Sequence, residues 1–561
     1  MRTIRHAHVR IGTAMAGAAA MAIATLATLP TPAANATTYS WNGTGTSWAS
    51  SASWTPAGVP GSGDTASFNT GSQTVDLNGN QAADQISVAS GPVTIQGGSG
   101  SYNLTLGGSG GGNILYYSQG SSSPITLGSA TPAEAVNVVI AATSSNQTIV
   151  DDSTSTLTFE NNVSGTSATG QITNLNVATN SSSYGDVVFN GIISDGTAGG
   201  LLALGDSVPV YLNGANTFTG GITISGMVNV ASLSDYGVAS AIGARTASQD
   251  ASQIGPGSIG LYFSGGTLQY TGATAQSTNR QIRLTEASTN TIDASGSNAA
   301  ATLDFTYDSA NTNLYNAPGP RTLNLIGSNT GRNTFSIGLT DQSSSGGQTS
   351  VVKAGVGTWV LNNPFGGNSY SGATSVNAGT LLVDSAIVSS PFTVNSAATL
   401  AGDGSTGTLT VNTGGILAPG DNAISGTTLS ATGGATLANS SVLDFTLGTP
   451  NVAGGTAGSD LLKTTTLSLG AGITVNVTQG AGFGLGTYSL IAYSGTLTGN
   501  FTGWTVAGLP GGETGAFSIG TDNGASAVQL TISRVPEPAS LALMAAAGAG
   551  ILLLVRRRRP A

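Results

Sequence analysis

Polar and apolar residues alternate with a period of two in many short runs between the two ends of the chain. Thr408–Val411, Leu467–Leu469 and Ile473–Val477 are examples. Pairs such as Gly-Gly, Asn-Gly and Asp-Gly separate these runs and supply the positive φ that tight turns need. No comparable stretch outside the termini has a helical period. Because period two is typical of half-buried strands, the pattern predicts an all-β fold, either a sandwich, a barrel or a β-solenoid.

An internal repeat favours the β-solenoid. Asn216–Val230 matches Asn368–Val383, with one residue missing before Gly226, and the aromatic residue, the glycines and the final aliphatic strand recur. A unit this short cannot bury its apolar face alone, so it must stack on neighbours of similar shape. The alignment makes Ile224 and Val376 equivalent, and it predicts that both side chains point into the stack.

The second copy is preceded by Gly355–Leu361, and together the copies resemble the autotransporter-associated β-strand repeat. This resemblance implies a right-handed β-helix (β-solenoid) exposed outside the cell. Leu400–Gly404 followed by Gly414–Gly420 looks like the terminal portion of the same exported proteins. Gly486–Leu490 and Leu497–Phe501 look like their closing β segment.

The N-terminus has the features of a secretory signal peptide. Three arginines lie in residues 1–10, the apolar stretch Ile11–Leu29 follows, and Ala34 and Ala36 are the small residues at positions −3 and −1. We therefore predict cleavage between Ala36 and Thr37. The alternative is an uncleaved membrane anchor.

The C-terminus has three consecutive parts. They are the motif Val535, Pro536, Glu537 and Pro538, the apolar stretch Ala539–Val555, and the basic cluster Arg556, Arg557, Arg558 and Arg559. Seventeen residues in a helix span about 25 Å, near the lower limit for crossing a membrane. We expect a single transmembrane helix with the arginines in the cytoplasm and the body outside. The alternatives are an apolar core helix and a permanent anchor that is not cut.

This C-terminal segment closely resembles the PEP-CTERM sorting signal. The resemblance implies a membrane-embedded exosortase as partner, which would cut near the Pro-Glu-Pro motif. The body would then pass from the inner membrane to the cell surface or the extracellular matrix.

Aromatic residues are concentrated just after the predicted signal peptide. The segment contains Trp41, Trp48, Trp54, Pro60, Asp64 and Phe68, and so three of the five tryptophans. It resembles the N-terminal segment of proteins that carry this repeat. We expect an aromatic cap over the open end of the solenoid. The alternative is a platform on which sugar rings stack.

The sequence therefore predicts five consecutive parts. They are a signal peptide at 1–36, an aromatic cap at 37–100, a β-solenoid with strand repeats at 101–383, a C-terminal solenoid with a closing β segment at 384–533, and a sorting signal with a transmembrane helix at 534–561.

Charge and composition exclude several function classes. Residues 37–533 hold seven basic and 24 acidic residues, a net charge of −17, which disfavours binding to nucleic acid. The chain has no cysteine, and both histidines, His6 and His8, lie in the predicted signal peptide. Serine–histidine and cysteine–histidine catalysis, thiolate or imidazole zinc sites, haem ligation by histidine or cysteine, and cysteine-ligated iron–sulfur clusters all need side chains that the mature protein would lack. We expect no cofactor and no metal.

Carboxylates are the remaining catalytic candidates. Asp151 and Asp152 form the only adjacent acidic pair, and Asp403 and Asp421 lie in glycine-rich turns. Paired carboxylates could hydrolyse glycosides, or with calcium could support a lyase reaction. Aspartates in such turns are more often turn formers, so we predict no catalytic residue and no enzyme activity.

We therefore expect an exported, surface-anchored or matrix-released structural or adhesive protein that associates with extracellular polysaccharide. The alternative is a β-helical polysaccharide lyase or glycoside hydrolase that uses acidic residues. A self-translocating autotransporter passenger is disfavoured, because the chain ends in one apolar helix where barrel strands would be needed.

Overall fold

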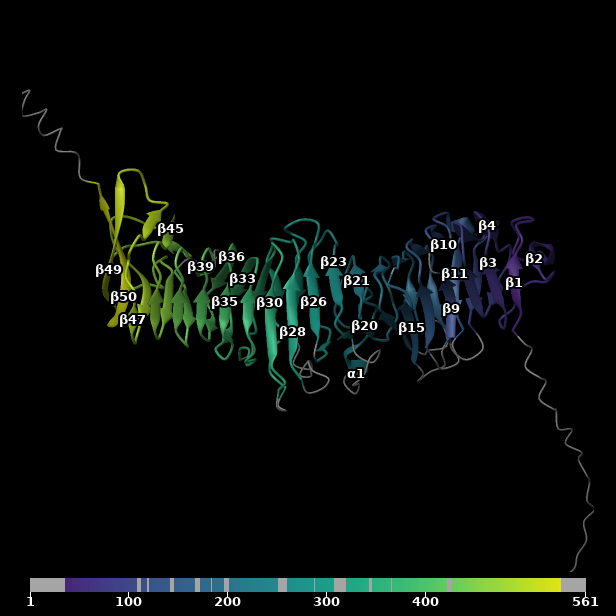
Figure 1. The fold of residues 1–561 in the computed structure, drawn as a ribbon, viewed down its shortest axis with the longest axis horizontal. Helices are drawn as coiled ribbons and strands as arrows, with labels where there is room; N and C mark the ends of the chain where they lie inside the picture. Colours follow the sequence, from purple (N-terminus) through teal and green to yellow (C-terminus); the bar gives the residue numbers. More distant parts are fainter. Residues whose placement is uncertain are drawn as a thin grey trace, which may run out of the picture. The chain divides into compact units, whose positions relative to one another are not determined.

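The computed structural model describes most residues between 36 and 535. The described ranges are 36–107, 112–118, 121–141, 146–166, 172–182, 184–195, 201–250, 260–286, 288–306, 319–342, 346–364, 366–420 and 426–535. The fold described below is that of the unit that begins at Thr37. This unit is a stack of short strands that winds through successive coils (Figure 1).

Sheet 2 is the longest sheet and runs through the stack as one parallel array of 17 strands. Its strands, in order, are β4 (Gln73–Asp76), β7 (Val93–Gln96), β10 (Ile125–Leu127), β13 (Leu157–Phe159), β16 (Val187–Phe189), β19 (Val210–Leu212), β21 (Met227–Val230), β23 (Thr267–Tyr270), β26 (Thr289–Ala294), β28 (Arg321–Ile326), β30 (Thr349–Lys353), β32 (Thr374–Val376), β35 (Phe392–Val394), β38 (Leu409–Val411), β41 (Ala435–Leu437), β44 (Leu467–Leu469) and β47 (Leu497–Thr498).

In the N-terminal coils, the chain enters sheet 2 from sheet 1 and leaves it into sheet 3. Sheet 1 has 11 strands, in the order β2 (Trp54–Thr55), β1 (Thr38–Trp41), β3 (Thr65–Phe68), β6 (Gln85–Val88), β9 (Gly112–Tyr117), β12 (Gln147–Asp151), β15 (Ile172–Ala178), β18 (Leu201–Asp206), β20 (Ile222–Ile224), β22 (Leu261–Phe263) and β25 (Ile282–Leu284). Sheet 3 has five strands, β5 (Gln81–Ala83), β8 (Tyr102–Leu106), β11 (Val136–Ile140), β14 (Val163–Gly165) and β17 (Ile193–Ser194).

In the C-terminal coils, sheets 4 and 5 take the places of sheets 3 and 1 in the chain order. Sheet 4 has ten strands, β24 (Gln276–Thr278), β27 (Leu303–Phe305), β29 (Asn333–Phe335), β31 (Thr358–Leu361), β33 (Gly379–Val383), β36 (Ala398–Gly402), β39 (Ile416–Pro419), β42 (Val442–Leu447), β45 (Thr474–Gln479) and β48 (Thr505–Ala507). Sheet 5 has seven, β34 (Ala386–Ile387), β37 (Ser405–Thr406), β40 (Thr428–Ala431), β43 (Leu461–Thr464), β46 (Gly486–Tyr493), β50 (Ala525–Arg534) and β49 (Glu513–Asp522).

The predicted all-β solenoid is thus confirmed as a stack of parallel sheets, and its right-handed winding stays a prediction. Helical turns among the described residues are short: the 3-10 turns η1 (Ser51–Ser53) and η2 (Pro132–Glu134) and the helix α1 (Ala247–Asp250). No helix in the described part of the chain is long and apolar enough to cross a membrane. The helix predicted for Ala539–Val555 lies outside the described residues.

The core forms because alternate side chains of each strand point inward. In β7, for example, Val93 and Ile95 are buried and Thr94 between them is half-buried. A single cluster of buried apolar side chains continues from Trp41 to Ile532. The same alternation confirms the inward orientation predicted from the repeat, since Ile224 and Val376 are both fully buried.

The two copies of the repeat occupy different faces of the coil. Ile224 lies on β20 of sheet 1, and the first copy then continues into β21 of sheet 2. Val376 lies on β32 of sheet 2, and the second copy continues into β33 of sheet 4. The repeat therefore specifies a strand, a turn and a second strand, and it occurs at two different corners of the coil.

Aromatic side chains fill the N-terminal end of the stack. Trp41, Trp48, Trp54 and Phe68 are 0–3% exposed, and their rings lie 4.9–6.2 Å apart between centroids. The indole nitrogen of Trp54 donates to the carbonyl of Trp48 at 2.8 Å. Since the indoles are buried, they offer no open ring face to a sugar, which supports a cap rather than a stacking platform.

An insertion interrupts the coil between β21 and β22. Here Arg245 pairs with Asp250 of α1, and both are buried. Arg280 is fully buried and donates to the carbonyls of Ile242 and Gly243 at 2.8 and 2.7 Å. Burial lowers the pKa of Arg280 to about 10. Backbone carbonyls of the insertion therefore stabilise the buried Arg280 side chain. This occurs after the last strand of sheet 3, β17, where loop takes the place of the strands of that sheet.

The C-terminal end is closed by an antiparallel hairpin. Strands β49 and β50 pair along their whole length, and β50 also pairs antiparallel with β46. Phe501, Trp504 and Phe517 pack together beside it, with ring centroids 5.1–5.8 Å apart. Both ends of the stack thus hold an aromatic cluster.

Candidate functional site

A glycine interrupts an outward-facing column of side chains on sheet 1. The register of β12, β15, β18, β20 and β22 places Thr148, Asn176, Gly205, Thr223 and Tyr262 side by side. Gly205 has no side chain, so a gap opens in the column between Asn176 and Thr223. The gap is the floor of a trough of about 310 Å³, at the lower end of the range for small-ligand sites.

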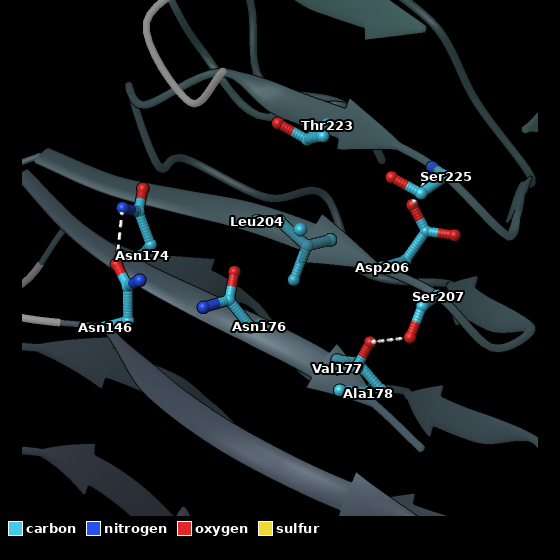
Figure 2. A pocket seen from close by; sticks show the side chains of 11 residues that line it. Asn146, Asn174, Asn176, Val177, Ala178, Leu204, Asp206, Ser207, Thr223 and Ser225 are labelled. Atoms are coloured by element: carbon cyan, nitrogen blue, oxygen red, sulfur yellow. Dashed lines mark hydrogen bonds between the residues drawn. The ribbon is translucent and has the colours of Figure 1, made fainter. Parts of the chain in front are cut away.

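The trough is lined mainly by amide, hydroxyl and carboxyl groups (Figure 2). The lining residues are Asn146, Asn174, Asn176, Val177, Ala178, Leu204, Gly205, Asp206, Ser207, Thr223 and Ser225. They come from successive coils, so no short sequence motif contains them.

Asparagine amides form one side of the trough. The Nδ2 of Asn174 donates to the Oδ1 of Asn146 at 2.8 Å, which fixes both side chains (Figure 2). The side-chain amide of Asn176 forms no hydrogen bond with another described residue, and it lies over Gly205. A Cβ at position 205 would come within 2.7 Å of the Asn176 Oδ1. The Asn176 amide therefore offers both a donor and an acceptor to a ligand in the trough.

Asp206 closes one end of the trough from an inward position. It pairs in register with Ile224, is 5% exposed, and accepts from the backbone N–H groups of Ser225 and Gly226 at 3.1 and 2.8 Å. Burial raises the pKa of Asp206 to about 7, although these two hydrogen bonds act in the opposite direction. No second carboxylate lines the trough. The two-carboxylate arrangement of glycoside hydrolases is therefore absent from this lining.

In the coil that precedes the second copy of the repeat, a lysine occupies the position equivalent to Asp206. Lys353 pairs in register with Val376 and is fully buried. Its Nζ donates to the carbonyls of Ala354, Gly355 and Ala378 at 2.8–2.9 Å. Burial lowers the pKa of Lys353 to about 8. This charge is enclosed by its own turn and has no access to a ligand.

The predicted acidic pair lies inside the coil. Asp151 is fully buried and its Oδ1 accepts from the N–H of Ser153 at 2.9 Å. Burial, reinforced by the negative charges of Asp152 and Asp186, raises the pKa of Asp151 to about 6. Asp152 is 3% exposed and accepts from the hydroxyl of Thr179 in the next coil at 2.9 Å. Both carboxyl groups therefore hold turns, as the structural alternative expected.

The other predicted residues are placed as follows. Asp403 is exposed in the turn after β36 and does not line the trough, and Asp421 lies outside the described residues. Ala36 is exposed, and the N–H of Thr37 donates to Asp64 at 3.0 Å. Val535 is half-exposed and its N–H donates to the carbonyl of Gly512. Outside the described residues lie Ala34, Pro536, Glu537, Pro538, Arg556, Arg557, Arg558 and Arg559. Signal cleavage and sorting stay predictions.

Exposed cations are scarce over the described residues. Five basic side chains are buried, namely Arg245, Arg280, Arg283, Arg321 and Lys353. Among the described residues only Arg332, Lys463 and Arg534 are exposed, and none of these lines the trough. In the part of the chain that the structure describes, no three or more His, Cys, Asp or Glu side chains are grouped so that they could hold a metal ion.

Comparison with known proteins places the repeats in a family. Residues 210–226 and 351–383 match the passenger-associated-transport-repeat, so the prediction of autotransporter-associated repeats is confirmed for these stretches. The first match includes Thr223 and Ser225 of the trough. The second runs from β30 to the end of β33.

A longer alignment links the chain to an adhesin. The "Adhesin BmaC autotransporter" of Brucella suis biovar 1 (strain 1330) is 28% identical over 378 residues. This alignment covers 54% of the chain and 10% of that protein, so the chain spans about a tenth of the relative's length. The chain is therefore similar to part of a distant autotransporter adhesin.

Proposed function

We propose that this chain is an exported adhesive protein of the cell surface or matrix, that it associates with extracellular polysaccharide, and that it is not an enzyme. The observation that carries the proposal is the outward side of the coils, where hydroxyl and amide groups recur from strand to strand. Sheet 2 presents such a column in Ser375, Thr393, Thr410, Thr436 and Ser468. Repeated polar groups suit many weak contacts with a hydrated polymer.

Asparagines beside this column are linked to one another. The Nδ2 of Asn395 donates to the Oδ1 of Asn377 at 2.7 Å, and the Nδ2 of Asn412 donates to the Oδ1 of Asn395 at 2.8 Å. The ladder holds these amides at a fixed spacing. Similarity to an autotransporter adhesin supports the adhesive role and an extracellular location.

Co-sedimentation with polysaccharide from the producing cells tests the association. We expect the purified full chain to sediment with this polymer and to remain in solution without it. A protein that stays in solution in both conditions would contradict the proposal.

Polysaccharide cleavage is the alternative function, and the raised pKa of Asp206 is the feature that favours it. Chain shortening by the purified protein, abolished in Asp206→Asn or in the Asp152→Asn variant, would replace adhesion with catalysis. We expect no shortening of neutral or anionic polymers.

We further propose that an exosortase processes the C-terminus, because Val535 to Pro538 precede an apolar stretch and four arginines. Pro536 and Pro538 lack a backbone donor and keep Glu537 in an extended segment open to a protease. Intact mass of the released protein tests this step. A mature chain that still ends in Ala561, unchanged when Pro536, Glu537 and Pro538 are all replaced by Ala, would leave only anchoring.

A further inference from the structure

We propose that the trough over Gly205 holds one sugar residue of a neutral polysaccharide. This inference rests on the proposed function, because it assumes that the protein binds a polysaccharide. It adds the place of binding and the chemical class of the polymer. Figure 2 shows the relevant side chains, among them Asn176, Asp206 and Thr223.

The first step is the chemistry of the lining. A sugar ring carries hydroxyl groups that both donate and accept, and amides are the side chains that offer both functions in fixed directions. The Asn174 amide is held by its hydrogen bond to Asn146, whereas the side-chain amide of Asn176 forms no hydrogen bond with another described residue. The trough thus has a fixed amide side and a free donor and acceptor above its floor.

The second step is the shape of the floor. Gly205 of β18 forms the floor beneath the Asn176 amide, and the neighbouring strands contribute Asn176 on one side and Thr223 on the other. A side chain at position 205 would fill this space, since its Cβ would already lie 2.7 Å from the Asn176 Oδ1. A trough of about 310 Å³ suits one ring of a chain that continues along the surface.

The third step is charge. The trough contains one carboxyl group, that of Asp206, and no basic side chain. The three exposed cations of the described residues lie elsewhere in the sequence, at Arg332, Lys463 and Arg534. A uronate or sulfated sugar would find no cation in the lining and would be repelled by the acidic body, so the site favours a neutral sugar.

Affinity gel electrophoresis of the purified full chain tests the inference. The neutral probes are dextran, galactomannan, xylan and laminarin, and the anionic probes are alginate and polygalacturonate. We expect retardation by at least one neutral probe and none by the anionic probes. In Gly205→Val the dissociation constant for the retained probe should rise at least tenfold, because valine suits a strand and fills the trough.

Gly520→Val is the matched control. Gly520 also lies in a strand, β49, and a Cβ there would also meet the amide end of one flexible side chain, that of Gln529. Its affinity should equal that of the parent. Thermal melting by circular dichroism reports the fold of each variant, and Asn176→Ala, which removes the free amide without filling the trough, decides the test if Gly205→Val melts early.

The outcomes separate this inference from the proposed function. Equal binding by the parent, Gly205→Val and Asn176→Ala would overturn the trough and leave polysaccharide association standing. Retardation by anionic probes alone would overturn the neutral class. If no probe and no native polysaccharide binds the parent, polysaccharide association fails, and the trough fails with it.

Discussion

The two copies of the repeat pack against residues of opposite charge in the preceding coil. In the first copy, the inward residue that pairs with Ile224 is Asp206. Its carboxyl group accepts from the N–H groups of Ser225 and Gly226, which form the turn that follows the strand. A Cβ on Gly226 would come within 2.7 Å of the Asp206 Oδ2, so glycine permits this approach.

In the second copy, the residue that pairs with Val376 is Lys353. Its ammonium group donates to the carbonyl of Ala378 in the following turn and to two carbonyls of its own turn. Gly379 again permits the approach, since a Cβ there would lie 2.8 Å from the Lys353 Nζ.

The difference follows from the length of the turn. The first copy lacks the residue that corresponds to Ala378. The shorter turn directs N–H groups at the preceding coil and the longer turn directs a carbonyl at it. Each turn therefore needs a buried partner of a particular sign, because a buried backbone group without a partner is costly.

Reversing either buried charge should have the largest effect on the free energy of unfolding. Asp206→Lys sets an ammonium group against two N–H donors, and Lys353→Asp sets a carboxylate against three carbonyl oxygens. Either change should cost more than about 5 kcal/mol of unfolding free energy, enough to prevent folding. Soluble yield and urea denaturation measure the effect. Asp403→Lys, at an exposed turn, should change stability by less than about 0.5 kcal/mol.

Removing the lysine should have the next largest effect. Lys353→Met keeps most of the side-chain volume but leaves three carbonyls without a donor, which should cost about 3–5 kcal/mol. Urea denaturation followed by circular dichroism checks this value. Lys463 is exposed, so Lys463→Met is the control and should denature like the parent. Equal midpoints for the two variants would show that Lys353 does not hold its turn.

The two buried charges should also make stability depend on pH in different ways. Because the pKa of Asp206 is raised from 3.8 to about 7, the folded state binds the proton more tightly, and stability falls as pH rises from about 4 to 7. Relative to Asp206→Asn, the parent should lose up to about 4 kcal/mol over this window. Denaturation at several pH values measures the difference, and a constant difference would contradict the burial of this carboxyl group.

Lys353 should show the complementary window. Its pKa is lowered from 10.5 to about 8, so the unfolded state binds the proton more tightly between these values. The parent should gain stability relative to Lys353→Met as pH rises from about 8 to 10.5. The two charges thus change stability in opposite directions on either side of neutral pH.

The smallest effect on stability is expected at the buried aliphatic position that both copies share, Ile224 in the first copy and Val376 in the second. Ile224→Val gives the first copy the inward residue of the second and should cost about 1 kcal/mol, because it removes one buried methylene. Ile519 is 49% exposed, and Ile519→Val should cost less than about 0.5 kcal/mol. Thermal melting distinguishes the two. Equal melting of both variants would mean that Ile224 is not tightly packed.

Much of the core could be predicted from the sequence, because period-two alternation reports which side chains point inward. Ile224 and Val376 are examples. The face on which each copy lies could not be predicted, since the same repeat occupies sheets 1 and 2 in one case and sheets 2 and 4 in the other. Which strands lie side by side depends on the loop lengths between coils. The alternation of polar and apolar residues within a strand does not indicate these lengths.

The trough was missed for the same reason. From the sequence alone, Gly205 resembles any other turn glycine. Only the register of β15, β18 and β20 places it between Asn176 and Thr223. Asp206 was missed because it follows this glycine at a strand end, where aspartate is a common turn residue. A charged residue at an inward position of the alternating pattern was the available signal, and Lys353 gives the same signal.

The number of sheets that join one coil to the next should determine where the stack unfolds first. Among the described residues, sheet 1 ends at Leu284 and sheet 5 begins at Ala386, so the coils between them are joined by sheets 2 and 4 alone. In a stack where each coil contacts its neighbours, cooperativity passes along these ladders. Between β17 and β24, sheets 1 and 2 alone join the described coils. We therefore expect the amide hydrogens of both two-sheet stretches to exchange before those of the coils that three sheets join.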